Sequence, residues 1–128
     1  MTLAPPPRGD AVALARALIA VDSRNPSLAP GASGEGDCAR TLAETLGNWG
    51  FRVALVESLP ERPSVVARIG RAGGRTLMFN GHLDTVGVEG MTHAPFDPVI
   101  TDGNIFGSGS CDMKGGVAAM CAAAVHAA

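Results

Sequence analysis

The end of the sequence, from Lys114 to Ala128, is almost entirely apolar and rich in alanine. Its larger side chains recur at helical spacing, at Val117, Met120, Cys121 and Val125. This pattern predicts a helix that is apolar on most of its faces, and such a helix needs cover from several neighbours. The chain has 128 residues, and a domain of that length buries roughly two thirds of its unfolded surface. We therefore expect a layered fold in which other elements pack around this helix.

Two further helices are predicted in the first part of the chain. Asp10 can cap the first, whose apolar face consists of Val12, Leu14, Leu18, Ile19 and Val21. Residues 22–36 are rich in Ser, Asn, Pro and Gly and predict an irregular loop. A second helix follows, with Cys38, Leu42, Leu46 and Trp49 on one face as core residues. Gly50 can adopt the left-handed conformation that ends it.

Strands are predicted between this helix and the apolar C-terminal one. Alternating or β-branched residues indicate strands at Phe51–Glu57 and Ser64–Ile69. The glycine-rich residues 70–74 suit a hairpin between Ser64–Ile69 and Arg75–Asn80. Within Arg75–Asn80 a continuous apolar run predicts a strand covered on both faces. Residues 98–106 suit a second hairpin that turns at Asp102-Gly103-Asn104. The order of elements predicts an α/β fold with a mixed, largely covered sheet and flanking helices.

The charge pattern excludes several classes of protein. The sequence has 10 basic and 12 acidic residues and a formal net charge of -2, with no block of one sign. It therefore gives no reason to expect nucleic acid or a membrane as partner. No secretory signal or membrane-spanning segment is recognisable, so a cytoplasmic location is expected. The three cysteines form no C-x-x-C pair and are expected to be reduced and mostly buried.

His82 and Asp84 follow directly after the apolar run at residues 77–79. In an extended chain their side chains lie on the same side, at the strand end where open α/β sheets place their sites. A neutral imidazole can bind a divalent metal through one nitrogen while a carboxylate holds its other N–H. A lone His-x-Asp tripeptide is more often a surface pair. By itself this motif therefore decides little.

A glycine-rich turn, GSGSCDMKGG from Gly107 to Gly116, contains Asp112 and leads into the apolar helix. It is not a phosphate-binding loop, because Met113 stands where that motif has glycine and Gly115 where it has Ser or Thr. The glycines let the backbone bend and present the Asp112 carboxylate, which could bridge two cations. The alternative role for Asp112 is a helix N-cap, and the two roles are compatible.

Taken together, GHLDTV, APFDP and DGNIFGSGSCDMKGG closely resemble the metal-dependent family of acetylornithine deacetylase, succinyl-diaminopimelate desuccinylase, aminoacylase and glutamate carboxypeptidase. The resemblance is specific from Asn80 to Gly116, and the loop at Asn25-Pro26-Ser27 fits it more loosely. It implies that residues 1–128 are the N-terminal portion of a zinc-peptidase-like catalytic domain. It also implies that a glutamate base, further metal ligands and a lid domain lie outside this chain.

Residue by residue, the resemblance makes His82 a ligand of one zinc or cobalt ion and Asp112 the carboxylate that bridges two such ions. Asp84 becomes the catalytic partner that orients His82, and the peptide bond after Asp112 is implied to be cis. Ser108 and Cys111 depart from the family pattern. Cys111 is compatible with an additional soft ligand and equally with a small buried thiol. His93 is expected to be exposed and His126 to be incidental, and no catalytic role falls to Lys114.

The resemblance implies a hydrolase that cleaves the amide bond of an N-acyl amino acid or small peptide with a water activated by two metal ions. The full-length protein could form a homodimer. The chain alone is expected to lack activity, because it supplies one histidine and one bridging carboxylate. The alternative is a non-catalytic, truncated fragment with at most weak metal binding. The sequence leaves open the choice among acetylornithine, succinyl-diaminopimelate, acyl-amino acids and dipeptides, and the choice between zinc and cobalt.

Overall fold

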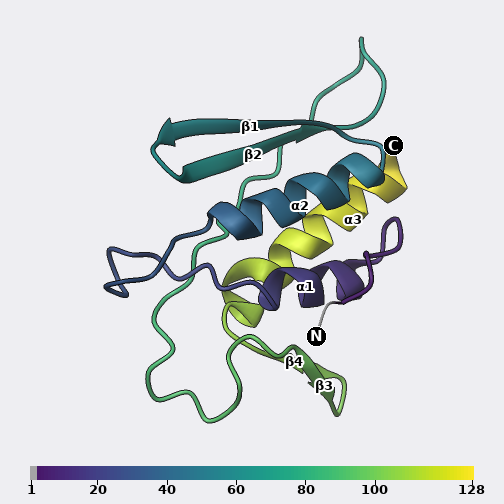
Figure 1. Cartoon of the computed structure of the whole chain (residues 1–128). Helices are drawn as coiled ribbons and strands as arrows, with labels where there is room; N and C mark the ends of the chain where they lie inside the picture. Colours follow the sequence, from purple (N-terminus) through teal and green to yellow (C-terminus); the bar gives the residue numbers. More distant parts are fainter. Residues whose placement is uncertain (1–2) are drawn as a thin grey trace.

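The computed structural model describes residues 3–128 of the chain. Within these residues three helices form the centre: α1 (Ala11–Ile19), α2 (Gly36–Asn48) and α3 (Gly115–Ala127). A hairpin of β1 (Arg52–Leu59) and β2 (Arg62–Arg68) lies over α2, and a short hairpin of β3 (Val99–Thr101) and β4 (Asn104–Phe106) lies beyond α1 (Figure 1). The molecule is thus a layered α/β arrangement, as the sequence predicts.

The helices pack through most of the residues that their spacing predicts, but Val12 of α1 is 53% exposed. Asp10 caps α1, since its Oδ1 accepts a hydrogen bond from the backbone N–H of Ala13 at 2.9 Å. Gly50 follows α2 with a φ of 94°, in the left-handed region. The predicted faces of the three helices meet in one core, which consists of Leu14, Ala15, Leu18, Cys38, Leu42, Leu46, Trp49, Val117, Ala118, Ala122 and Val125.

The first hairpin contains the two predicted strands, but their partners differ from the prediction. Residues 64–69 were expected to pair with residues 75–80, whereas β2 pairs with β1 in antiparallel register. This pairing turns Val53, Val65 and Ala67 toward the helical core, where they become partly buried. The burial of these side chains against α2 explains why β1 is the partner.

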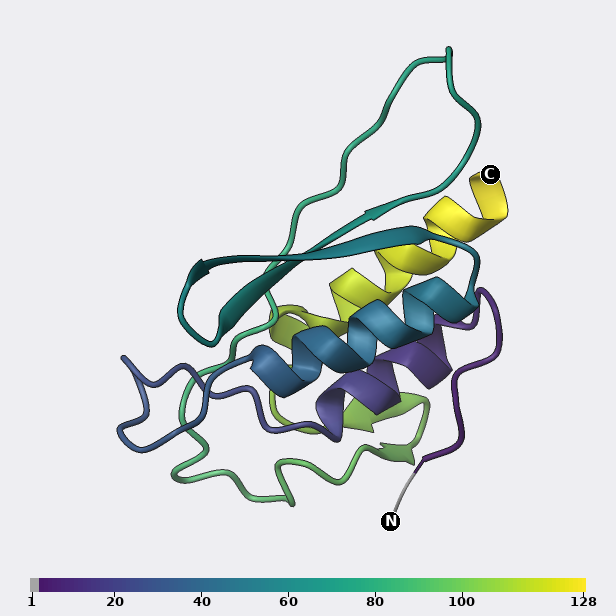
Figure 2. The same ribbon diagram turned by 45° about the horizontal axis from the view of Figure 1, so that its top comes forward.

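The residues between β2 and β3 form no helix or strand and run down one side of the molecule (Figures 1 and 2). The strand predicted at Arg75–Asn80 is therefore wrong for this structure. Its apolar run is exposed, with Leu77 at 78% and Met78 at 81% of their reference surface. Among the described residues no strand lies beside this segment to form a hydrogen-bonded ladder with it.

The sheet also departs from the mixed, largely covered sheet that was expected. The described residues form two separate two-stranded sheets, and both are antiparallel. The β1–β2 hairpin is covered on one face by the helices, and it leaves Leu55, Val56, Leu59 and Val66 exposed. A single parallel bridge between Arg24 and Thr85 lies outside both sheets.

The second hairpin and the last helix confirm their predictions. Asp102 and Gly103 have φ values of 51° and 77°, the positive values that a two-residue turn with Asp-Gly favours. After β4 a kinked turn, η1 (Ser110–Lys114), leads into α3. Helix α3 packs mainly against α1. It buries the predicted Val117 and Val125, whereas Met120 and Cys121 are only partly buried.

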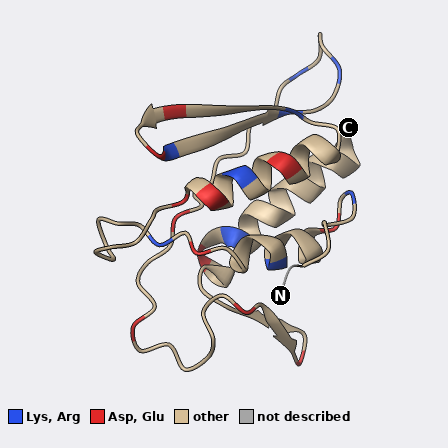
Figure 3. Cartoon of the chain, in the orientation of Figure 1, with Lys and Arg blue, Asp and Glu red and all other residues tan. Residues whose placement is uncertain are grey.

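Basic and acidic residues are interspersed over α1, α2, the first hairpin and the loops, whereas α3 has no Lys, Arg, Asp or Glu (Figure 3). In residues 3–128 no helix is both long enough and apolar enough to cross a membrane.

Candidate metal centre

His82 and Asp112 meet beside the start of α3, although they lie 30 residues apart in the sequence. The Nε2 atom of His82 lies 2.9 Å from Oδ1 of Asp112. The sequence predicted this approach, and the structure confirms it. The His82 side chain is 47% exposed and the Asp112 side chain 84% exposed, so the pair is open to solvent.

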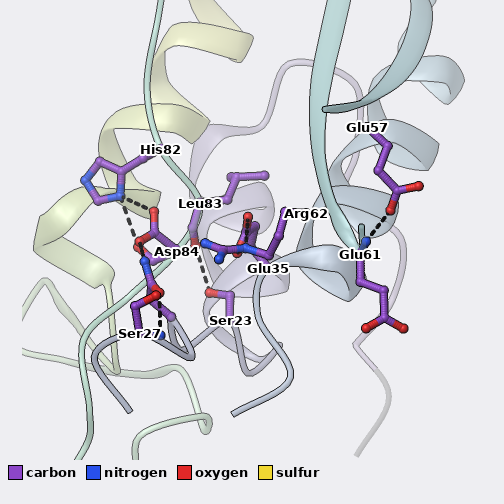
Figure 4. Close-up of polar contacts among 10 residues, drawn as sticks. Ser23, Ser27, Glu35, Glu57, Glu61, Arg62, His82, Leu83 and Asp84 are labelled. Atoms are coloured by element: carbon purple, nitrogen blue, oxygen red, sulfur yellow. Dashed lines mark hydrogen bonds and ion pairs between the residues drawn. The ribbon is translucent and has the colours of Figure 1, made fainter. Parts of the chain in front are cut away.

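Asp84 lies behind the His82 ring, on the side away from Asp112. Nδ1 of His82 is 3.0 Å from the backbone oxygen of Asp84 and 3.3 Å from its carboxylate Oδ1 (Figure 4). Both of these oxygens are acceptors, so they favour a proton on Nδ1. A cation or a proton on Nε2 then satisfies the contact with Asp112.

The surroundings of His82 change its pKa in two opposing directions. Partial burial lowers the pKa of the ring, because it disfavours the charged form. The hydrogen bond to Asp112, the hydrogen bond to the Asp84 backbone and the two carboxylate charges raise it. The raising contributions together prevail, so the His82 pKa lies above its ordinary value. The same negative charge that stabilises a proton on this ring would stabilise a metal cation beside it.

The backbone around His82 is held by residues that follow α1. The Ser23 hydroxyl donates to the Leu83 carbonyl at 2.8 Å, and the Thr85 N–H donates to the Ser23 carbonyl at 2.9 Å. The side-chain amide of Asn25 donates from Nδ2 to Oδ2 of Asp84 at 2.8 Å. The Asn25 loop stands out in the sequence, but this contact does not. Its partners lie about sixty positions away, and no local pattern signals that distance.

Lys114 is a second residue whose partners the sequence did not reveal. It is fully buried, and its ammonium donates to the backbone carbonyls of Leu18 at 2.7 Å and Val21 at 2.9 Å. Leu18 lies in the last turn of α1, and Val21 lies two residues beyond its end at Ile19. The ammonium thus sits at the C-terminal end of the helix, where carbonyls lack intrahelical partners. Burial lowers the Lys114 pKa. The available signal was that this is the only lysine of the sequence and stands at the start of an apolar helix.

The turn that presents Asp112 depends on glycine at two positions. Gly109 has a φ of 76°, and a Cβ there would lie 2.5 Å from Cγ2 of Thr85. A Cβ on Gly115 would lie 2.7 Å from the Ser110 carbonyl oxygen. The Asp112–Met113 peptide bond is cis, as the resemblance implies. Gly109 thus allows the turn to pass close to Thr85, and Gly115 allows it to pass close to the Ser110 carbonyl.

Two readings of this turn are wrong. Asp112 makes no capping hydrogen bond, and the residue at the N-cap of α3 is Lys114. Cys111 is exposed rather than a small buried thiol, while Cys38 is buried and Cys121 partly buried, and all three are free. Burial raises the pKa of the Cys121 thiol to about 11.

The other histidines lie apart from this pair. His93 is exposed, as expected, and its ring meets Phe106 edge-on at a centroid distance of 5.5 Å. His126 is also exposed, and its Nε2 lies 3.1 Å from the Gly9 carbonyl oxygen.

The donor atoms fit one part of a metal site. An imidazole nitrogen and a carboxylate oxygen at 2.9 Å are a donor pair typical of zinc, and Asp84 supports the imidazole from behind. Residues 3–128 contain no group of three or more His, Cys, Asp or Glu side chains that could hold a metal ion. The described residues therefore supply two donors, fewer than the four that a zinc ion needs.

Comparison with known proteins agrees with this geometry. Residues 78–128 match the profile of the peptidase family M20/M25/M40. A succinyl-diaminopimelate desuccinylase of Methylorubrum extorquens is 44% identical over 119 residues, which are 88% of this chain and 29% of that protein. The enzyme of the same name from Gluconacetobacter diazotrophicus is 40% identical over 114 residues, which are 85% of this chain and 28% of that protein.

The chain belongs to the peptidase family M20/M25/M40, whose members are metal-dependent. It is similar over most of its length to desuccinylases, which are amidohydrolases of this family. The chain spans less than a third of the length of these curated relatives, at 29% and 28%.

Proposed function

We propose that the protein of which this chain forms part is a metal-dependent hydrolase that cleaves the amide bond of an N-acyl amino acid or small peptide. The observation that carries the proposal is the contact of His82 Nε2 with Asp112 Oδ1, backed by Asp84 on the other ring nitrogen. Membership of the M20/M25/M40 family supports the same class of reaction.

The residues of this chain would hold and orient the metal. His82 would bind one divalent ion, zinc or cobalt, through Nε2, and Asp112 would share its carboxylate between two such ions. When bound, the metal pair supplies a water of lowered pKa as the nucleophile. Asp84 would fix the ring of His82 and keep the proton on Nδ1, which leaves Nε2 free for the metal.

Among the possible substrates, an N-succinylated amino acid is best supported. The relatives that match most of the chain are named succinyl-diaminopimelate desuccinylase. Acetylated amino acids and dipeptides are the alternatives within the same reaction class, and a small-molecule substrate of this kind is the proposed partner.

We further propose that residues 1–128 form the N-terminal portion of the catalytic domain. The general base and the remaining ligands would then come from another part of the protein. For the chain by itself the second candidate function is weak metal binding without turnover. The absence of a third donor among the described residues favours it.

The test is an assay of the product of the whole reading frame that contains this chain, with zinc or cobalt, on N-succinyl-diaminopimelate, N-acetylornithine and dipeptides. We expect amide cleavage that a chelator abolishes and that His82→Ala lowers at least about 100-fold. Cleavage that survives both treatments would contradict the proposal. The 128-residue chain, assayed in parallel, is expected to show none.

A further inference from the structure

We infer that Asn25 is a positioning residue for the metal centre: its side-chain amide holds Asp84 in the orientation that fixes the ring of His82. The inference rests on the proposed function, because it gives Asn25 a role in preparing His82 for a metal ion.

The amide of Asn25 has a different partner at each end. Its Nδ2 donates to Oδ2 of Asp84 at 2.8 Å, and its Oδ1 accepts the backbone N–H of Ser27 at 2.9 Å. Because Oδ1 is occupied by a donor, a rotated amide would lose both hydrogen bonds. The contact with Ser27 therefore determines that Asn25 presents a donor to Asp84.

The backbone of Asn25 is also hydrogen-bonded to the segment that contains Asp84. The Asn25 N–H donates to the Thr85 carbonyl at 2.8 Å, next to the hydrogen bond between the Thr85 N–H and the Ser23 carbonyl. Ser23 is fully buried and Thr85 is 5% exposed, so these bonds are shielded from water. These backbone hydrogen bonds consequently hold Asn25 and Asp84 side by side, independently of the contact between their side chains.

The two oxygens of Asp84 then have separate tasks. Oδ2 accepts from Asn25, and Oδ1 lies 3.3 Å from Nδ1 of His82 (Figure 4). With the carboxylate held at one oxygen, the other stays beside Nδ1 together with the Asp84 backbone oxygen. These contacts keep the proton on Nδ1 and turn Nε2 toward Asp112. The order of contacts is Asn25, Asp84, His82 and Asp112.

Asn25 also shapes its own loop, and the test must separate the two roles. Besides the Ser27 contact, the Asn25 carbonyl accepts the N–H groups of Leu28 and Ala29 at 2.9 and 2.8 Å. Asn25→Asp keeps an acceptor for Ser27 but places a carboxylate against Asp84. The double variant Asn25→Asp, Asp84→Asn reverses donor and acceptor, so residue 84 again offers an oxygen to His82.

The experiment uses the 128-residue chain without metal, in an Asp112→Ala background that removes the competing acceptor from Nε2 of His82. It reads the ¹⁵N shifts of the His82 ring at a pH where the ring is neutral. We expect the Nδ1–H tautomer in this background, a mixture of tautomers when Asn25→Asp is added, and recovery of the Nδ1–H tautomer when Asn25→Asp and Asp84→Asn are both added. The backbone amides of Leu28 and Ala29 should keep their shifts in Asn25→Asp. Zinc titration with Asp112 intact should show affinity about 10-fold lower for Asn25→Asp than for the parent chain.

An unchanged tautomer in Asn25→Asp would overturn the inference. So would a changed tautomer accompanied by displaced amides of Leu28 and Ala29, since Asn25 would then act through its loop alone. Failure of the double variant to recover the tautomer would also overturn it. If zinc left the His82 ring of the parent chain unaffected while the tautomers responded as expected, the proposed metal centre would fail and the positioning by Asn25 would stand.

Discussion

The helical core and the segment that carries His82 are built on different interactions. In the core, Leu18 is fully buried and Trp49 is 1% exposed, and their neighbours on α1, α2 and α3 interlock around them. In the segment from Leu77 to Val86, Leu77 is 78% exposed and Val86 63% exposed. What holds this segment is a set of hydrogen bonds to Ser23 and Asn25.

The stability of the fold and the geometry of the site therefore depend on different residues. Apolar burial in the core supplies most of the free energy of folding. The hydrogen bonds from Ser23 and Asn25 place His82 and Asp84 and contribute less to that free energy. Lys114 links the core to the turn that presents Asp112 to His82. Its ammonium binds carbonyls at the end of α1, and Asp112 lies two residues before it in the sequence.

The largest expected effect contrasts two leucines from these regions. Leu18→Ala should lower the free energy of unfolding by about 3 kcal/mol, since it removes a fully buried side chain and leaves a cavity. Leu77→Ala should change it by less than about 0.5 kcal/mol. Urea unfolding followed by circular dichroism measures both. Equal losses would show that the Leu77 segment is packed as tightly as the core.

A smaller effect is expected where the two regions are joined. Lys114→Met keeps the apolar stem but removes the ammonium from two carbonyls, and should lower the unfolding free energy by about 2 kcal/mol. Arg40→Met is the control, because Arg40 forms an exposed surface pair with Asp37, and should cost less than about 0.5 kcal/mol. If the two variants unfolded at the same urea concentration, Lys114 would not connect α1 with the Asp112 turn.

Local patterns predicted most of the core, and the family resemblance implied the approach of His82 to Asp112. Helical spacing identified the buried faces, and a turn with Asp-Gly identified the β3–β4 hairpin. The pairing of β2 and the state of residues 75–80 were predicted wrongly, because an apolar run does not reveal which element lies beside it. The partners of Asn25 and Lys114 were not predicted, since they lie 59 to 96 positions away. Hydrogen bonds over such distances follow from the fold and leave no periodic signal.

The smallest expected effect concerns Asp22, beside the residues that hold the His82 segment. The hydrogen bond from the Arg24 side chain lowers the Asp22 pKa below its ordinary value of 3.8 and outweighs the opposing effect of burial. The folded state therefore favours the ionised carboxylate, which stabilises it above that value. Asp22→Asn should lower the unfolding free energy by about 0.5 kcal/mol at neutral pH.

The difference in unfolding free energy between the parent chain and Asp22→Asn should shrink as the pH falls from 3.8 through the pKa of Asp22 in the folded state. Over that range the parent chain becomes protonated at Asp22 and loses the stabilisation that the variant already lacks. Urea unfolding of both proteins at several pH values checks it. A difference that persisted at the lowest pH would contradict the assignment to the Asp22 carboxylate.

We propose above that His82 and Asp112 lie together to hold a divalent cation. Zinc titration of the 128-residue chain, followed by the ¹⁵N resonances of its histidine rings, tests this claim. Nε2 of His82 should shift at lower zinc concentrations than any nitrogen of His93 or His126, and Asp112→Asn should weaken this response about 10-fold or more. A response in which zinc affected all three rings alike, or in which Asp112→Asn behaved as the parent chain, would contradict the claim.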